Sequence, residues 1–261
     1  MTQIYMKRMV LALLSLSLFI AAPLPAAEIA IAADADLKFA LDELTQEFRA
    51  SHTDTTVKLT YGSSGNFFAQ LQNHAPFDLF FSADIEYPRK LAAAGLALET
   101  NVFRYAIGRI VVWTPTNSPL NVTNLGIRAL LDPAAKKVAV ANPQHAPYGR
   151  AAVAAMKSLG VYEQVEPRLV LGENIAQTAQ FVQSGAADVG IIALSLAIAP
   201  QMRAAGRYWE IPTDAYPRME QGGIILKWAK DTDAAKSFRD FVLGEHGRTV
   251  LKRYGFFLPE E

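Results

Sequence analysis

The fold is decided by the stretch Tyr61-Gly62-Ser63-Ser64-Gly65-Asn66, which joins an alternating apolar run to a helical pattern. The preceding run Val57-Lys58-Leu59-Thr60 is typical of a strand. A strand that turns through small hydroxyl residues into a helix presents unpaired N–H groups at a positive dipole end, where anions bind. Glycine and serine are also ordinary turn and cap residues, so this stretch alone leaves both interpretations open.

Outward from this stretch, strand-like and helical segments alternate, which predicts α/β units with largely parallel sheets. Strands are expected at residues 28–33, 57–61, 79–81, 107–113, 137–141, 169–171, 189–193 and 222–227. Helices are expected at residues 37–50, 66–72, 88–94, 125–131, 149–159, 175–185, 194–204 and 234–244. The two similar cycles predict two lobes, each a mostly parallel sheet flanked by helices and joined by two hinge strands. Residues 28–108 and 222–261 would form lobe 1, and residues 109–221 would form lobe 2.

The N-terminus has the pattern of a secretory signal peptide at residues 1–27. Lys7 and Arg8 precede an apolar run at residues 9–22, which is shorter than the about 20 residues that span a bilayer. We therefore expect an exported mature chain of 234 residues that begins at Glu28. Pro25 is not the usual small residue before a cleavage site, so retention as a membrane anchor stays open.

The composition excludes several classes of protein. There is no Cys, so the chain has neither a disulfide framework nor a lipid-modified cysteine. The 25 basic and 25 acidic residues are interspersed, and loss of the signal peptide would leave a formal charge of −2, which argues against a nucleic-acid partner. The serine-rich turn has no neighbouring His in sequence and no Gly-x-Ser-x-Gly elbow, which argues against a hydrolase.

Four strand-to-helix loops have a similar composition, and two fall in each expected lobe. They lie at residues 33–37, 62–65, 143–149 and 172–175. In open α/β sheets, ligands bind beyond the carboxyl ends of the strands, so closure of the lobes could aim all four sets of N–H groups at one small anion. None of these loops contains Lys or Arg, and a site of dipoles and hydroxyl groups favours a tetrahedral oxyanion over an amino acid or a metal cation. Ordinary helix caps would produce the same pattern.

Several segments resemble periplasmic molybdate-binding proteins, a family of type II solute-binding proteins. The resemblance rests on residues 62–66, 75–84, 142–149, 172–175, 188–191 and 251–256, which follow the order of the family over the whole mature chain. It implies a two-lobed periplasmic receptor for molybdate, and often tungstate, that serves an ABC importer with its permease in the inner membrane. We expect no cofactor, no enzymatic activity and a monomer.

The ligand positions that the resemblance implies fall on Asp36, Ser63, Ser64, Tyr148 and Ile175. Molybdate would be held through its oxygen atoms by Ser64, Tyr148 and Ile175, with no direct metal ligand. Ile175 would act through its backbone N–H alone. Some family members have a ligand tyrosine where this chain has Ala193, and Tyr148 could supply the missing hydroxyl group.

Asp36 stands where the resembled family has Ser or Asn. A dianion about 4 Å from a carboxylate is opposed by roughly 8 kcal/mol at an effective dielectric constant of 20. Asp36 could cap its own helix and face away, hold a proton when the ligand binds, or accept a proton from the ligand. Because Asp is a strong N-cap, we expect the first arrangement. The third would favour hydrogen phosphate or hydrogen arsenate, so a receptor for phosphate, arsenate or sulfate is the main alternative, with a secreted hydrolase less favoured.

Overall fold

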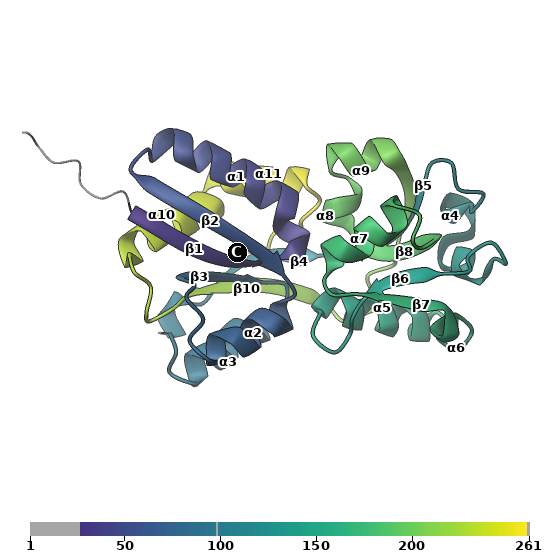
Figure 1. Cartoon of the computed structure of the whole chain (residues 1–261), viewed down its shortest axis with the longest axis horizontal. Coiled ribbons are helices and arrows are strands. Elements are labelled where there is room, and N and C mark those ends of the chain that lie inside the picture. The colour runs from purple at the N-terminus through teal and green to yellow at the C-terminus, as the bar shows by residue number, and fades with distance from the viewer. Residues whose placement is uncertain (1–26, 98, 260–261) are drawn as a thin grey trace, which may run out of the picture.

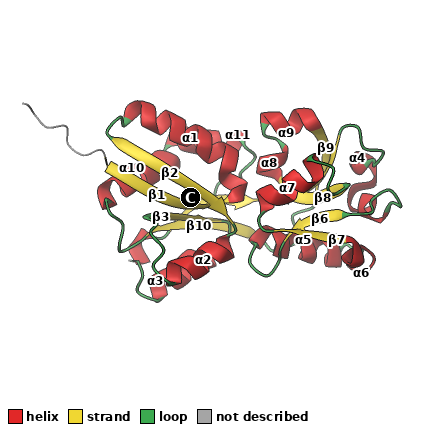
Figure 2. Ribbon diagram, in the orientation of Figure 1, coloured by secondary structure: helices red, strands yellow, loops and turns green. Residues whose placement is uncertain are grey.

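The computed structural model describes residues 27–97 and 99–259. They form two lobes that lie side by side, one built from the N-terminal and C-terminal parts of the chain and the other from the middle (Figure 1). Each lobe has a five-stranded sheet with helices on both faces (Figure 2), which confirms the predicted α/β architecture. The expected signal peptide lies outside the described residues except for Ala27, the first residue of β1. None of the helices in the described part of the chain is long and apolar enough to cross a membrane.

Lobe 1 has the strand order β2-β1-β3-β10-β4, in which β1 is parallel to β2 and β3 while β10 is antiparallel to both of its neighbours. The strands are β1 (Ala27–Asp34), β2 (Thr55–Gly62), β3 (Leu79–Ser82), β4 (Phe103–Gly108) and β10 (Met219–Ile225). One face is covered by α1 (Lys38–Ser51), α10 (Thr232–Leu243) and α11 (Glu245–Arg253). The other is covered by α2 (Ser64–Gln72) and α3 (Glu86–Ala93).

Both faces of the first sheet are apolar because both are covered. Along β1, Ile29 and Ile31 pack with α1 and α10, whereas Ala32 packs with Phe67 of α2. The spacing of Leu41 and Leu44 in α1 places both on the face that covers the sheet. A sheet that is buried on both faces requires strands with few polar residues, which is why these strands could be recognised in the sequence.

Lobe 2 has the strand order β7-β6-β8-β5-β9, with β6 parallel to β7 and β8 and with β5 antiparallel to both of its neighbours. The strands are β5 (Ile110–Pro115), β6 (Val138–Ala141), β7 (Leu169–Gly172), β8 (Val189–Ala193) and β9 (Gly206–Glu210). The helices are α4 (Val122–Leu125), α5 (Pro147–Ser158), α6 (Tyr162–Val165), α7 (Ile175–Gln183), α8 (Leu194–Ala197) and α9 (Pro200–Ala205). Four 3₁₀ segments complete the chain: η1 (Ala35–Leu37), η2 (Glu99–Asn101), η3 (Gly126–Leu131) and η4 (Glu166–Arg168).

The chain crosses between the sheets twice, from β4 to β5 and from β9 to β10. The prediction of one strand at residues 107–113 is wrong, because β4 ends at Gly108 and β5 begins at Ile110 in the other sheet. Gly108 lets the crossing strand pass close to the lobe interface, where an added Cβ atom would lie 2.6 Å from both Tyr148 Oη and Gln221 Nε2. The expected lobe boundary at 108/109 falls in this crossing, and the one at 221/222 falls within β10.

The other differences from the predicted elements have local causes. The helix expected at residues 194–204 is divided into α8 and α9 because Pro200 cannot continue a helix. The helix expected at residues 125–131 is mainly the 3₁₀ segment η3, which begins at Gly126 with a φ of 59°. The sequence patterns also missed β9, α6 and α11.

Candidate functional site

The four predicted loops meet between the lobes. Parallel pairing aligns Asp34 with Gly62 at the end of β1 and β2, and Ala141 with Gly172 at the end of β6 and β7. These carboxyl ends face one another across the lobe interface, and hydrogen bonds join them. The Gly65 N–H donates to the His145 carbonyl at 2.9 Å. The structure therefore has its lobes closed, with the expected ligand loops in contact.

Two further contacts link the second loop to lobe 2. The Ser63 hydroxyl lies 2.9 Å from Nδ1 of His145. The Asn66 side chain donates to Glu173, which precedes α7. His145 Nε2 lies 3.6 Å from Glu173 Oε2, so His145 bridges the second, third and fourth loops.

Asp34 caps the helical segment that follows β1. Its Oδ1 accepts a hydrogen bond from the Asp36 N–H at 3.4 Å. Its Oδ2 accepts two more, from the Ser64 N–H at 3.0 Å and from the Ser64 hydroxyl at 2.5 Å. The expectation that Asp36 is the cap and faces away is therefore wrong, because the carboxylate two residues earlier occupies that position.

The Asp36 side chain points into the lobe interface and is 1% exposed. Its Oδ2 accepts hydrogen bonds from the Tyr148 hydroxyl and from Gln221 Nε2, each at 2.7 Å. Its backbone carbonyl accepts a bond from the Ser195 hydroxyl at 2.8 Å. The other carboxyl oxygen, Oδ1, is buried, and no N–H or O–H group of the described residues donates to it.

Burial dominates the electrostatics of this carboxyl pair. Burial, together with the nearby Asp34 carboxylate, raises the pKa of Asp36 well above its ordinary value, and the bonds from Tyr148 and Gln221 offset only part of this effect. Burial also raises the pKa of Asp34, against the opposing hydrogen bonds from Ser64 and the Asp36 N–H. Burial raises the pKa of the Tyr148 phenol well above 10, so this group remains a neutral donor near neutral pH.

Two helices of lobe 2 begin beside the first loop of lobe 1. Tyr148 is the second residue of α5, after Pro147, and Ile175 is the first residue of α7. N–H groups in the first turn have no acceptor within the helix. Asn174 caps α7 by accepting from the Gln177 N–H at 2.9 Å, which leaves the Ile175 N–H directed outward from the helix end. Ile175 shares a buried apolar cluster with Ala35 of the first loop.

Ser64 is fully buried at the N-terminus of α2. Besides donating to Asp34, its hydroxyl accepts a hydrogen bond from the Ala83 N–H at 2.9 Å. In this arrangement the hydroxyl and the N–H of Ser64, a predicted anion ligand, are both directed at the Asp34 carboxylate. Asp34 thus occupies donors that an oxyanion would use.

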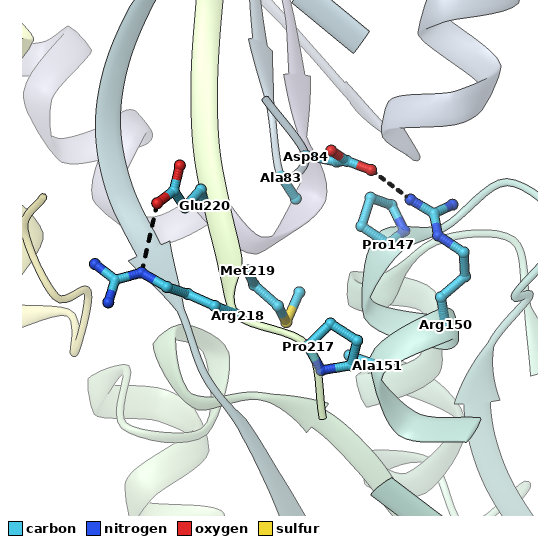
Figure 3. A pocket seen from close by; sticks show the side chains of 9 residues that line it. All are labelled: Ala83, Asp84, Pro147, Arg150, Ala151, Pro217, Arg218, Met219 and Glu220. Atoms are coloured by element: carbon cyan, nitrogen blue, oxygen red, sulfur yellow. Dashed lines mark hydrogen bonds and ion pairs between the residues drawn. The ribbon is translucent and has the colours of Figure 1, made fainter. Parts of the chain in front are cut away.

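A cavity of about 330 Å³ opens at the lobe interface beside these groups (Figure 3). Its lining includes Pro147, which precedes Tyr148, and Ala83, whose N–H donates to Ser64, but none of the five predicted ligand residues. An ion pair crosses the interface at its edge, with Arg150 Nη2 2.7 Å from Asp84 Oδ2. The second guanidinium nitrogen of Arg150 donates to the Tyr87 hydroxyl at 3.2 Å.

Three polar groups of this interface were missed in the sequence. Asp34 lies in a loop that was identified, and the spacing Asp34-Ala35-Asp36 allowed either carboxylate to be the cap. Gln221 follows Glu220 in β10 and is fully buried there, but a polar residue within a strand is only a weak sequence signal for a functional side chain. Ser195 follows directly after Ala193 and Leu194 at the end of β8, a position where other loops of this chain carry site residues.

Similarity to known proteins agrees with this geometry. The model of a family described as bacterial extracellular solute-binding protein matches residues 29–257. The chain is 35% identical over 243 residues to the molybdate-binding protein ModA of Rhodobacter capsulatus, covering 93% of each chain. It is 36% identical over 233 residues to the ModA of Azotobacter vinelandii, covering 89% of this chain and 91% of that protein. The solved structure of an Azotobacter vinelandii periplasmic molybdate-binding protein superposes with a TM-score of 0.83 at 32% identity, covering 89% of this chain and all of that one.

Proposed function

This chain belongs to the family of bacterial extracellular solute-binding proteins, and we propose that it captures molybdate between its lobes and delivers it to an ABC importer. Tungstate, an anion of the same shape and charge, would bind in the same way. The proposal places the mature protein in the periplasm as a monomeric receptor, with a membrane permease as its partner. Its role is binding and release rather than catalysis.

The observation that carries the proposal is the meeting of two helix N-termini of lobe 2 with a serine turn and an aspartate turn of lobe 1 across a closed interface. The N-terminal ends of α5 and α7 come from lobe 2, while η1 and α2 begin at the facing loops of lobe 1. Such a set supplies many uncharged donors, and a tetrahedral dianion supplies acceptor oxygens in several directions. A helix end stabilises negative charge without a fixed counter-ion, so the cargo could be released when the lobes open.

The mechanism that follows is closure about the two crossing segments. An oxyanion would first bind the loops of one lobe in the open form, and closure would add the N–H groups of the other lobe. The bonds from Gly65 to His145 and from Tyr148 to Asp36 join different lobes, so they form only when the lobes close. The permease would then recognise the surface that the closed form presents.

A hydrolase is the second candidate, because folding brings Ser63, His145 and Glu173 together. Two features argue against it. The 3.6 Å separation of His145 Nε2 from Glu173 Oε2 is too long for a hydrogen bond that would orient a catalytic base. Ser63 is also 1% exposed, so a substrate could not reach its hydroxyl in the closed form. Hydrolysis of a model ester that is lost in Ser63→Ala would favour this second function.

The binding function is tested at Ile175, where a donor can be removed while the helix is kept. Proline is tolerated at the first position of a helix but has no N–H, so Ile175→Pro should weaken molybdate binding by about tenfold or more. Ile175→Val keeps the N–H and accounts for the loss of side-chain packing. Isothermal titration calorimetry with molybdate, tungstate, sulfate and phosphate measures both variants. Equal affinity of the two variants for molybdate would contradict the assigned donor, and failure of the unmodified protein to bind any of the four anions would contradict the proposed function.

A further inference from the structure

The Asp36 carboxyl group has two oxygens in very different surroundings. Oδ2 accepts two hydrogen bonds, from Tyr148 and Gln221, whereas no N–H or O–H group of the described residues donates to the buried Oδ1. A buried carboxylate oxygen to which no protein group donates is costly in the charged form, since that form loses its solvation without compensation. The Asp34 carboxyl group lies within hydrogen-bonding reach of Asp36 but can only accept while it is charged, so the pair is satisfied when Asp36 holds a proton.

The hydrogen-bond pattern fixes where a proton would sit. Gln221 Nε2 can only donate, and the Tyr148 hydroxyl has its one proton directed at Oδ2, so Oδ2 acts as an acceptor in both contacts. A neutral Asp36 must then carry its proton on Oδ1. In that state Oδ1 is an O–H donor whose acceptor within the chain is the Asp34 carboxylate, and a bound oxyanion would compete with Asp34 for this donor.

The groups that surround Asp36 add no positive charge. Its nearest titratable neighbours are Asp34 at the end of β1, Tyr105 on β4 and Tyr148 on α5. The nearby groups on β10 and α8, Gln221 and Ser195, are neutral. On α1, Lys38 is directed at Asp42, at 3.2 Å, and before α7, Glu173 is bonded to Asn66 and lies near His145. Burial and the Asp34 charge accordingly raise the pKa of Asp36.

We propose that Asp36 holds a proton on Oδ1 and donates it in a hydrogen bond to the bound oxyanion, so that this residue sets both the pH range and the selectivity of binding. The inference rests on the proposed function and deepens it. An aspartic acid in its neutral form offers the cargo what an asparagine amide would, with the difference that the donor disappears when the proton is lost. Protonation of Asp36 also removes the negative charge that would repel a bound dianion and provides a hydrogen-bond donor in its place.

The direction of the pH effect follows from linkage. A bound dianion favours the protonated form, so the pKa of Asp36 is higher in the complex than in the free protein. Affinity is then greatest below the pKa of the free protein. It falls by about tenfold per pH unit as the pH rises from that pKa toward the pKa of the complex, because binding takes up one proton in this range.

Selectivity follows from the same donor. An O–H group on Asp36 needs a cargo oxygen that has a free lone pair and carries no proton. Fully deprotonated anions such as molybdate and sulfate meet this demand on every oxygen, whereas hydrogen phosphate presents a hydroxyl group of its own. Once Asp36 is ionised, its carboxylate can only accept a hydrogen bond. The affinity for hydrogen phosphate, which carries its own O–H donor, should then fall less than the affinity for molybdate.

The test compares the unmodified protein with Asp36→Asn, which keeps an acceptor for Tyr148 and Gln221 and presents a permanent N–H donor in place of Oδ1. Calorimetric titration with sodium molybdate from about pH 6 to about pH 9, in two buffers of different ionisation enthalpy, gives the affinity and the number of protons taken up. We expect the unmodified protein to lose affinity with rising pH and to take up close to one proton over the pH interval in which affinity falls. We expect Asp36→Asn to bind with an affinity that is nearly independent of pH and to take up none.

Two results would overturn the inference. If both proteins bind molybdate with the same pH profile and the same proton uptake, Asp36 is not the proton carrier, although the proposed function stands. If neither protein binds any oxyanion, the proposed function fails and the inference fails with it. Infrared difference spectra provide a second measurement, since the protonated carboxyl band of the complex should be absent in Asp36→Asn, and its persistence in that variant would assign the proton to Asp34 instead.

Discussion

The two faces that meet at the candidate site are built differently. Lobe 1 contributes buried side chains that carry or bind charge, namely Asp34, Asp36, Ser64 and Gln221. Lobe 2 contributes mainly the N-terminal ends of α5 and α7 and the neutral hydroxyl of Tyr148. The difference indicates a division of labour, in which lobe 1 sets the charge state of the site and lobe 2 adds neutral donors on closure.

The packing of the closed interface follows the same division. Ala35 and Ala83 of lobe 1 belong to the apolar cluster that forms the core of lobe 2. The remaining core of lobe 1 lies in two separate clusters on the two faces of its sheet. Closure therefore seats two small residues of lobe 1 against the second core, directly beside the polar groups of the site. A larger side chain introduced between the lobes at this point should weaken closure more than it destabilises the fold of either lobe.

The largest effect is expected for Gly65→Ala, which separates closure from the chemistry of lobe 1. A Cβ atom at Gly65 would lie 2.5 Å from the His145 carbonyl oxygen and 2.9 Å from its Cα, so the closed interface cannot form without a shift. Within α2, alanine is a better helix former than glycine, so lobe 1 itself should not be destabilised. We expect about a 100-fold loss of molybdate affinity with an unchanged or higher melting temperature.

Calorimetry and thermal unfolding measure these two quantities, and small-angle scattering with and without molybdate reports closure. Gln70→Ala is the matched control, because this exposed residue lies on the same helix. If Gly65→Ala binds as tightly as the control, lobe 2 does not contribute to the bound state, and the division between the lobes is wrong.

A smaller effect, of about tenfold, is expected for Tyr148→Phe. This change removes the hydroxyl that lobe 2 directs at the Asp36 carboxyl group, a bond of 2.7 Å. A hydrogen bond to a buried polar group contributes about 1 kcal/mol. Because the bond from Tyr148 lowers the pKa of Asp36, its loss should raise that pKa and move the alkaline decline in affinity to higher pH.

Tyr105→Phe gives the control for this second prediction. The Tyr105 hydroxyl is equally buried but donates to the Ser82 carbonyl at 3.1 Å, within lobe 1. The control should lose stability without moving the pH profile of binding. A profile that shifts equally in both variants would show that Asp36 responds to general loosening of the site and not to the donor from lobe 2.

Much of this fold could be predicted from the sequence, because local patterns determine it. Strands covered on both faces are apolar throughout, and the loops after β1, β2, β6 and β7 carry the small and polar residues that end them. The crossing from β4 to β5 could not be predicted in this way. Residues on both sides of Arg109 are apolar and β-branched, and only the position of the second sheet divides them into two strands.

The candidate site could be predicted in location but not in detail. The four loops share a composition that marks them as ligand loops, and the resemblance to molybdate-binding proteins selected residues within them. Which carboxylate is the cap depends on tertiary contacts, since Asp34 is held by Ser64, thirty positions further along the chain. Gln221 comes from the last strand of lobe 1 and reaches Asp36 across 185 positions, a contact that no local pattern contains.

The smallest effect is expected for Arg150→Ala, which removes the cation that α5 places at the edge of the cavity in Figure 3. The side chains of Arg150 and Asp84 are 40% and 29% exposed, and ion pairs of this kind contribute about 0–1 kcal/mol. We expect molybdate affinity to fall about threefold at low ionic strength and the difference to vanish at high ionic strength. Arg89→Ala, which breaks an ion pair with Glu86 inside lobe 1, should change neither.

The size of the Arg150 effect bears directly on the comparison between the lobes. A loss of about threefold that salt abolishes fits a clamp that favours the closed form from the edge of the interface. A loss of more than about tenfold that persists at high salt would mean that the guanidinium group interacts with the anion itself. Lobe 2 would then contribute charge as well as neutral donors, and the charge state of the site would no longer be set by Asp34 and Asp36 alone.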